Sequence, residues 1–370
     1  MGITEKINEI KDEMAKTQKN KATNYHLGTL KAKLAKLRSM QTEESKGGKG
    51  AEGEGFEVEK LGHARIAMIG FPSVGKSTML NVLTETESLS AAYEFTTLTC
   101  IPGFIYHNEA KLQLLDLPGI IEGAASGKGR GRQVIAVGKS SDLIMMVLDT
   151  QKGEEQKAKL TLELESVGIR LNQPKPLITV KQTNKGGVMI NCTVKRTKMD
   201  DKMIKNVLAE YKMHNAHVVM RGDYTVDELI DSIEGNRHYV KCLYVYNKID
   251  TVSIEDVDQL ARLPNTTVIS SGMKLGLELL KERIWEMLGL VRVYTKKKGS
   301  QPDLSDPLIL TKGRGGYSVK AAIKQIHKGL LTNFKCAYVW GKSAKHSPQK
   351  VGLIHELADE DVLQIMKKGN

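Results

Sequence analysis

An eight-residue loop pattern constrains this chain more than any other feature. Residues 70–77 read GFPSVGKS, which fits G-x-x-x-x-G-K-[ST], and they follow a short apolar run, IAMI, at 66–69. A strand before the loop and helix-forming residues after it are the context in which this pattern binds phosphate. The sequence therefore predicts an α/β fold with a mainly parallel sheet and a phosphate-binding loop, rather than a glycine turn that carries a lysine by chance.

Each position of the loop has a chemical reason. Gly70 and Gly75 let the backbone turn tightly enough for several N–H groups to face one phosphate. Lys76 would place its charge between the β- and γ-phosphates, and the Ser77 hydroxyl would bind Mg²⁺. A helix that begins near Lys76 adds the positive end of its dipole. The predicted nucleotide contacts here are Gly70, Phe71, Pro72, Ser73, Val74, Gly75, Lys76, Ser77 and Thr78.

A second motif predicts which base is bound. An apolar run at 244–246 ends in the pattern N-K-x-D at 247–250. The last carboxylate would accept hydrogen bonds from guanine N1–H and the exocyclic amine, and adenine lacks this pair of donors. GTP and GDP are therefore the predicted ligands; an ATPase or P-loop kinase would need Asp250 to tolerate adenine. The predicted contacts of the base are Asn247, Lys248, Ile249 and Asp250, and the loop backbone of Ser270, Ser271 and Gly272, which would reach guanine O6.

The motifs between these two occur in the order that a GTPase needs. A partly alternating run at 111–115 leads into Asp116, Leu117, Pro118 and Gly119. Asp116 would hold Mg²⁺ through water, and the Gly119 N–H would meet the γ-phosphate. Upstream, residues 93–97 (YEFTT) supply a threonine that would close over Mg²⁺ when GTP is bound, so Phe95, Thr96 and Thr97 join the predicted nucleotide site.

With these motifs the chain resembles the developmentally regulated GTP-binding protein family, which is related to the Obg GTPases. The resemblance covers essentially the whole chain, including residues 14–23, 26–38, 70–78, 93–97, 116–123, 130–137, 291–298 and 346–365. It implies that Thr97 is the Mg²⁺-sensing threonine, that the C-terminal part is a β-grasp (TGS) domain, and that a dedicated regulatory protein binds the chain. The expected catalytic residues are Lys76, Thr97, Asp116 and Gly119, and the expected Mg²⁺ ligands are Ser77, Thr97 and Asp116.

The residue after D-x-x-G bears on hydrolysis. Ras-like enzymes place there a glutamine that orients the attacking water, whereas this chain has Ile120. We therefore expect slow turnover, with the missing group supplied by a partner or by a bound monovalent cation, K⁺. Relatives that use K⁺ hold it with an asparagine of the phosphate loop, where this chain has Ser73. An arginine finger from the basic run at 128–132 is an alternative to a plain flexible basic loop.

Periodicity and composition predict four parts. Residues 1–45 form a basic helical hairpin, with apolar stripes at Ile3, Ile7, Ile10 and Met14 and at Leu27, Leu30, Leu34 and Leu37. Residues 46–60 are a glycine-rich linker and lead-in, and 61–290 form the GTPase domain with an inserted α+β subdomain at about 168–236. Residues 291–370 form the fourth part, which the resemblance identifies as the TGS domain; its helix is expected at 319–330 with Val319, Ala322, Ile323 and Ile326 buried.

Charge is concentrated at the two ends of the chain. The whole chain is formally +12; residues 1–50 carry 11 basic and 6 acidic groups, and residues 291–370 carry 15 and 6. Basic appendages on a neutral core favour attachment to a phosphate-rich surface, most simply ribosomal RNA, although solvated lysines are the plain alternative.

These features leave two interpretations of function. One is a GTP-hydrolysing switch that acts on ribosomes in translation; the other is a nucleotide-dependent scaffold in which hydrolysis is incidental. The four cysteines show no metal-ligand spacing, the charged first residues exclude a signal peptide, and the longest apolar run, at 143–148, is too short to span a bilayer. We therefore expect a soluble, cytoplasmic protein without a membrane partner.

Overall fold

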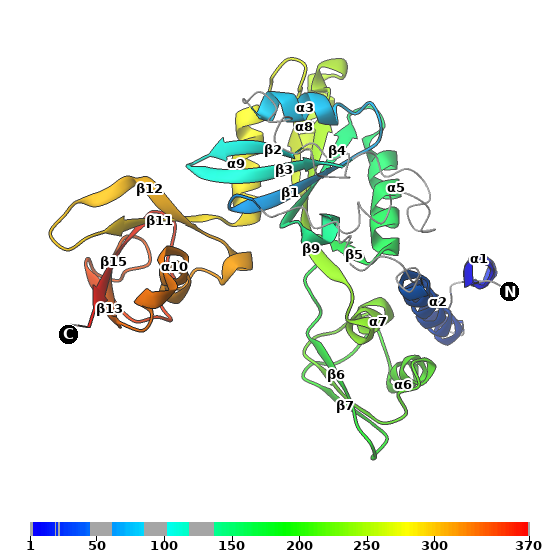
Figure 1. Cartoon of the computed structure of the whole chain (residues 1–370). Coiled ribbons are helices and arrows are strands. Elements are labelled where there is room, and N and C mark those ends of the chain that lie inside the picture. The colour runs from blue at the N-terminus through cyan, green and yellow to red at the C-terminus, as the bar shows by residue number, and fades with distance from the viewer. Residues whose placement is uncertain are drawn as a thin grey trace. The chain divides into compact units, whose positions relative to one another are not determined.

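The computed structural model describes residues 3–18, 20, 23–44, 61–84, 102–117 and 137–368 (Figure 1). These residues fall into two compact units. One contains the described residues up to 44 together with 163–239, and the other contains 61–117, 137–162 and 240–368 where described. Among the described helices, none is both long and apolar enough to cross a bilayer. The predicted linker at 46–60 lies outside the described residues.

The larger unit is built on a mainly parallel sheet. Only the pairing of β2 with β3 is antiparallel along this path. Every residue of β1 is buried, as expected for a central strand covered on both faces, which reads as a continuous apolar run. The strand order is β10 (Thr266–Val268), β9 (His238–Asn247), β4 (Leu143–Asp149), β1 (Ala64–Ile69), β3 (Ala110–Asp116) and β2 (Pro102–His107).

Helices cover both faces of this sheet. On one face, α3 (Lys76–Leu83) and α9 (Leu277–Leu288) share a buried core with alternate residues of the strands. On the other face, α5 (Gly153–Ser166) starts against Tyr246, whose hydroxyl donates to Glu154 Oε1 at 2.6 Å. A further helix, α8 (Ile254–Ala261), lies between β9 and β10 in the chain. Because β1, β3, β4, β9 and β10 are parallel, the loops that follow them meet at one edge.

The smaller unit joins the N-terminal helices to the insertion. Its three-stranded sheet has the order β6 (Ile178–Gln182), β8 (Ala216–Met220) and β7 (Val188–Cys192), with β5 (Ile169–Leu171) preceding it in the chain. Two helices, α6 (Asp201–Glu210) and α7 (Val226–Glu234), cover one face of this sheet. Both begin with side-chain caps, from Asp200 and Thr225 respectively.

The N-terminal helices, α1 (Ile3–Lys16) and α2 (Asn24–Glu44), do not pack only on each other. Ala32 and Ala35 of α2 are buried in the same core as Met203 and Val207 of α6. The alanines have no long side chain, so α6 can approach α2 closely on a face that the leucine stripe does not mark. The N-terminal hairpin and the insertion therefore share one core.

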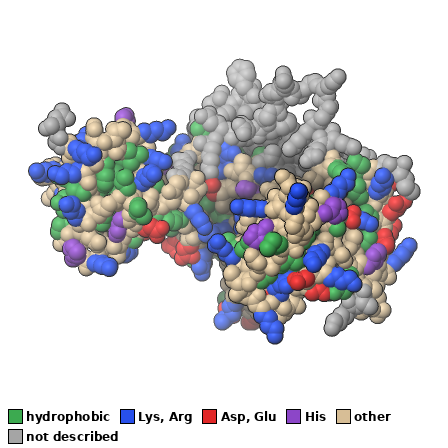
Figure 2. Space-filling model, turned by 90° about the horizontal axis from the view of Figure 1, so that it is seen from below, with side chains coloured by type: hydrophobic (Ala, Val, Ile, Leu, Met, Phe, Trp, Pro, Cys, Tyr) green, Lys and Arg blue, Asp and Glu red, His purple; other side chains and the backbone are tan. Residues whose placement is uncertain are grey.

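The C-terminal part is a mixed five-stranded sheet with one helix. Its strand order is β12 (Pro302–Leu310), β11 (Val291–Lys296), β15 (Asp361–Lys367), β13 (Phe334–Trp340) and β14 (Gln349–Val351). The pair β11–β15 is parallel, and the other pairs are antiparallel. The helix α10 (Val319–Ile326) packs on one face of the sheet. Lys and Arg side chains are scattered over this part's visible surface, among hydrophobic and other residues (Figure 2, left).

The predicted extent of α10 was wrong. The α-helix ends at Ile326, because His327 is extended and its imidazole accepts a hydrogen bond from the Gly329 N–H at 3.1 Å. A separate 3₁₀ turn follows at Lys328–Leu330. Val319, Ala322 and Ile323 are buried as expected, but Ile326 is 39% exposed, because it lies in the last turn of the helix.

Candidate nucleotide site

The predicted phosphate loop lies between β1 and α3. Ser73 and Gly75 have positive φ values of 65° and 90°, and α3 begins at Lys76. A Cβ on Gly70 would come within 2.5 Å of the Val147 carbonyl oxygen of the neighbouring strand, so the loop can leave the sheet here only with glycine. Phe71, Pro72, Ser73 and Thr78 are at least partly exposed, whereas Val74 is buried and anchors the loop.

Lys76 folds over the loop that precedes it. Its Nζ donates to the Gly70 carbonyl at 2.9 Å and to the Phe71 carbonyl at 3.0 Å. Burial lowers the pKa of Lys76, and the nearby Asp116 carboxylate partly offsets this effect. The ammonium is therefore held inside the loop, where an anion bound by the loop amides would meet it.

Asp116 and Ser77 form the second part of the site. Asp116 ends β3, and its Oδ2 accepts a hydrogen bond from the Ser77 hydroxyl at 3.0 Å. Burial raises the pKa of Asp116, while Ser77 and the charge of Lys76 oppose the shift. Its other oxygen, Oδ1, is buried without a hydrogen-bond partner among the described residues. An unsatisfied carboxylate oxygen beside a hydroxyl fits a hard cation such as Mg²⁺.

Asn247 joins the phosphate loop to the N-K-x-D loop. It ends β9 and is fully buried. Its Nδ2 donates to the Val74 carbonyl at 2.8 Å and to the Ser271 hydroxyl at 2.9 Å. Its Oδ1 accepts from the backbone N–H groups of Lys248 and Ser271, each at 2.9 Å. One amide side chain thus holds three loops together.

The contact is close enough to restrict Gly75. A Cβ built on Gly75 would lie 2.4 Å from Asn247 Nδ2, and its φ of 90° also disfavours any other residue. The two motifs are therefore fitted to each other: glycine in one loop leaves the room that the amide of the other loop occupies.

Lys248 forms an ion pair with a residue that belongs to none of the sequence motifs. Its Nζ donates to Asp149 Oδ2, at the end of β4, at 2.8 Å. Burial raises the pKa of Asp149, but hydrogen bonds from Lys248 and the Gln151 N–H bring it below its ordinary value. The Thr150 and Thr251 hydroxyls both donate to the Lys248 carbonyl. The sequence could have indicated Asp149 only by its place at the carboxyl end of a central strand.

Asp250 lies at the open side of this loop. It belongs to a 3₁₀ turn, Ile249–Thr251, and is exposed to solvent. The Ser270 hydroxyl donates to its Oδ1 at 2.6 Å, which fixes the carboxylate relative to the Ser270–Gly272 loop. The Ser271 N–H already donates to Asn247, so among these residues Gly272, which is exposed, is better placed to offer a backbone N–H to a ligand.

The structure brings the described members of the predicted site to one sheet edge. Gly70 to Thr78, Asp116, Leu117, Asn247 to Asp250 and Ser270 to Gly272 lie on loops at the carboxyl ends of β1, β3, β9 and β10. The predicted residues Phe95, Thr96, Thr97, Pro118 and Gly119 lie outside the described residues, as do Ile120 and the basic run at 128–132.

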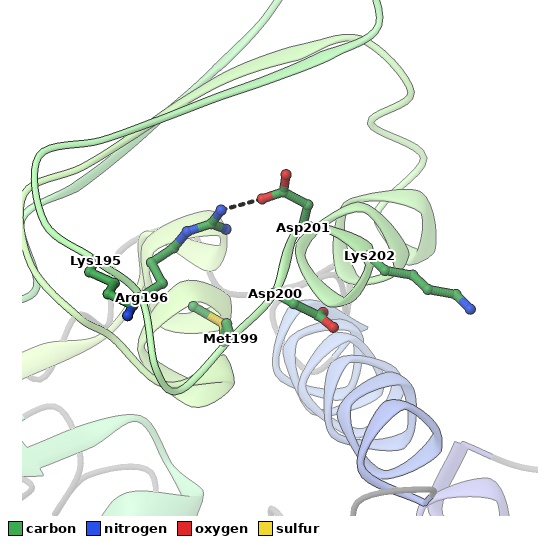
Figure 3. A pocket seen from close by; sticks show the side chains of 6 residues that line it. All are labelled: Lys195, Arg196, Met199, Asp200, Asp201 and Lys202. Atoms are coloured by element: carbon green, nitrogen blue, oxygen red, sulfur yellow. Dashed lines mark hydrogen bonds and ion pairs between the residues drawn. The ribbon is translucent and has the colours of Figure 1, made fainter.

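A separate hollow of about 560 Å³ lies in the insertion, lined by Lys195, Arg196, Met199, Asp200, Asp201 and Lys202 (Figure 3). Arg196 forms an ion pair with Asp201, and Asp200 accepts from the Met203 N–H and the Tyr25 hydroxyl. Lys202 points away from the Arg196–Asp201 pair. Asp200 thus joins the start of α6 to α2, whereas Asp201 pairs with the loop that carries Arg196, and we assign no ligand to this hollow.

Three regions of the chain match known protein families. Residues 65–183 match a family described as 50S ribosome-binding GTPase, and residues 185–290 match the C-terminal region of MMR_HSR1 domain. Residues 291–367 match the TGS domain.

Individual proteins also match the chain over its whole length. The chain is 59% identical to Developmentally-regulated G-protein 2 of Arabidopsis thaliana over 368 residues, covering 100% of this chain and 92% of that protein. It is 58% identical to Developmentally-regulated GTP-binding protein 2 of Homo sapiens, covering 100% of both. Among solved structures, the FeoB G-domain from Methanococcus jannaschii aligns with 60% of this chain and 96% of its own, at 18% identity and a TM-score of 0.32.

Proposed function

Because this chain belongs to the family of developmentally regulated GTP-binding proteins, we propose that it binds GTP and GDP and hydrolyses GTP slowly. The predicted fold is confirmed: a P-loop GTPase domain with a mainly parallel sheet, followed by a TGS domain. The observation that best supports the proposal is the Asn247 amide, which holds the phosphate loop and the N-K-x-D loop in one fixed relation. Such a relation is needed when one ligand must reach both loops.

Different residues of the site bind different parts of the nucleotide. The amides of Gly70 to Lys76 bind the phosphates, and Lys76 leaves its loop carbonyls to neutralise the β- and γ-phosphate oxygens. The Asp250 carboxylate accepts hydrogen bonds from guanine N1–H and the exocyclic amine, while the Ser270 hydroxyl holds its Oδ1 in place. Lys248 lays its aliphatic stem along the base while its Nζ remains on Asp149.

Mg²⁺ fits this site and belongs to the proposal. Ser77 and Asp116 would hold it, with Thr97 joining when GTP is bound. The ion would neutralise charge on the phosphate oxygens during transfer to water. Because the pKa of Asp116 is raised by burial, the carboxylate would lose its charge at a higher pH than an ordinary aspartate, and Mg²⁺ binding would weaken as pH falls toward that pKa.

Hydrolysis is expected to be slow because Ile120 cannot orient water. A regulatory protein or K⁺ would supply the missing group. Ser73 is exposed at the turn of the phosphate loop and offers a hydroxyl there, in place of an asparagine amide. Comparing hydrolysis rates in potassium and sodium chloride separates these sources: equal rates would remove the cation from the proposal.

We further propose that the chain acts in the cytoplasm as a ribosome-associated switch in translation, together with a regulatory protein. The basic ends of the chain support a phosphate-rich partner. Sedimentation with ribosomes in the presence of GTP, GDP or a non-hydrolysable analogue tests this step. Co-sedimentation that depends on the nucleotide is expected; none at low salt would contradict it and would favour the scaffold interpretation.

A further inference from the structure

The C-terminal sheet has two different faces. Val293, Ala337 and Leu363 point to the face that α10 covers and are fully buried. Successive side chains of a strand point to opposite faces, so Tyr294, Val362 and Trp340 point to the other face. There they remain partly exposed. Among the described α-helices, α10 alone contributes residues to this sheet's core, and the side chains of the second face are partly accessible.

Strand register places aromatic side chains in rows across this second face. Trp340 pairs with Val362, and Val362 pairs with Tyr294, so the two aromatic side chains flank the central strand β15. In the next row Tyr338 pairs with Gln364. Neighbouring strands are about 4.8 Å apart, so Trp340 and Tyr294 are separated by roughly 10 Å. We call Tyr294, Tyr338, Trp340 and Val362 the aromatic face.

Lysines border the aromatic face. The Lys296 Nζ lies 4.9 Å from the centroid of the Trp340 ring, within the range of a cation–π contact. Lys350 of β14 is exposed and pairs in register with Tyr338. The whole segment 291–370 carries 15 basic and 6 acidic residues. Flat rings with cations beside them are complementary to a base and its phosphate.

We propose that the aromatic face binds unpaired RNA, with bases stacked on Trp340 and the tyrosines and with phosphates near Lys296 and Lys350; this rests on the proposed action on ribosomes. Stacking on aromatic side chains requires bases that are not already stacked in a duplex. A protein partner would also use tyrosine and tryptophan, but lysine is depleted in protein interfaces and enriched where phosphates are bound.

The fluorescence of tryptophan gives a direct test on the full-length chain. The chain has two tryptophans, Trp285 and Trp340, and Trp285 packs against the core of the parallel sheet. An unstructured RNA of about 12 nucleotides, within the length that one stacking surface binds, is expected to quench the emission. A Trp340→Leu variant should lose this quenching, because the stacking ring is gone.

Affinities of variants extend the test. Trp340→Leu and Tyr338→Leu should each weaken binding of the unstructured RNA by about fivefold or more, since one stacked base contributes roughly 1–3 kcal/mol. Lys350→Gln removes one positive charge. The slope of log affinity against log salt concentration should therefore become shallower by less than one. The matched control is Tyr106→Leu on β2, which removes a 61% exposed tyrosine whose ring also lies near a lysine, Lys111 Nζ at 6.0 Å from its centroid. It should leave the RNA affinity unchanged.

Binding of labelled GDP, measured on every variant, shows that the site of the parallel sheet is intact. If GDP binds and the RNA affinity of Trp340→Leu and Tyr338→Leu equals that of Tyr106→Leu, the inference is overturned and the aromatic face is left to a protein partner. A hairpin RNA of equal charge that quenches as strongly as the unstructured RNA would also overturn it. Failure of ribosome co-sedimentation with RNA quenching intact would contradict the proposed function but not this site.

Discussion

At the scale of single residues, Asn247 explains why two distant motifs form one site. Its amide nitrogen faces the phosphate loop and its amide oxygen holds the N-K-x-D and Ser271 backbones. Asn247 is fully buried, and its bonds to Val74 and Ser271 are buried too, so losing one of these would leave a polar atom unpaired, which costs roughly 1–3 kcal/mol. These contacts therefore fix the loops relative to one another.

Gly75→Ala tests this contact. The new methyl group would collide with Asn247 Nδ2, and the backbone would remain at a φ of 90°. We expect loss of nucleotide affinity and a stability decrease of roughly 1–3 kcal/mol, measured by GDP titration and urea unfolding. The control is Gly352→Ala, where a Cβ would have no atom within 4 Å. Equal behaviour of both variants would contradict the close fit.

Asp250→Asn tests the recognition of the base. The amide would offer donors where guanine also offers donors, so GTP affinity should fall roughly 10- to 100-fold. Xanthosine triphosphate, which has a carbonyl at that position, should instead bind the variant better than wild type. Both affinities can be measured by competition with a labelled nucleotide.

Asp256→Asn is the control for this change, because Asp256 also accepts a hydrogen bond from a serine hydroxyl, that of Ser253, at 2.8 Å. Its nucleotide preference should match that of wild type. A variant Asp250→Asn that retains full preference for GTP would show that this carboxylate does not read the base.

Sequence motifs were sufficient to predict which residues lie together at the edge of the parallel sheet, but not the residues that hold them in place. Gly70, Lys76 and Asp250 follow from spacing, because each is required by the ligand's chemistry. Asp149 belongs to no motif, and its contact with Lys248 depends on the pairing of β4 with β9, which places Asp149 opposite Asn247. Such supporting contacts follow from strand order, which a pattern does not encode.

At the scale of elements, the Lys248–Asp149 ion pair ties the end of β9 to the end of β4. The pKa of Asp149 is lowered, so the pair adds stability above the ordinary aspartate pKa of about 3.9, and this stability is lost as pH falls through the folded-state pKa. Asp149→Asn should therefore lower stability by up to about 1 kcal/mol at pH 7, and the difference from wild type should shrink at pH values below about 4, toward the folded-state pKa.

Urea unfolding at both pH values measures this effect. The control is Asp258→Asn, which removes an ion pair with Arg262. The Asp258 side chain is 59% exposed and the Arg262 side chain 77%, so this change should affect stability little. A difference for Asp149→Asn that grows toward low pH would have the wrong sign and would contradict the assignment.

The shared core of α2 and α6 gives a second prediction at this scale. Ala32 is fully buried, so Ala32→Leu should overfill the core and destabilise the smaller unit by roughly 1–3 kcal/mol. The neighbouring Lys33 is exposed, and Lys33→Leu should have little effect. Hydrogen exchange of the α6 amides reports on this core directly; equal protection in both variants would show that α2 does not stabilise the insertion.

Element positions were predicted well where periodicity is strong. The strands β1 and β3 lie within a few residues of the runs expected at 66–69 and 111–115. The strand β6 was not predicted, because ITVKQ is short and follows two prolines, Pro174 and Pro176. The end of α10 was misplaced because its stop depends on the backbone of His327 rather than on a glycine or proline.

At the scale of the whole molecule, the sequence suggested a hairpin and an insertion as separate additions to one domain. The structure groups them instead into one unit with a common core. Small residues such as Ala32 carry no strong periodic signal, so this association could not be read from the chain. The two basic ends of the chain consequently belong to different units: the first to the hairpin and insertion, the last to the TGS part.

Competition between nucleotides is the most direct test of the whole account. Labelled GDP bound to the purified chain with Mg²⁺ is displaced by increasing GTP or ATP. We expect GTP to displace it at a concentration at least about 100-fold lower than ATP, because only guanine offers the two donors that Asp250 accepts. Equal displacement by GTP and ATP would contradict the central claim that this site recognises guanine.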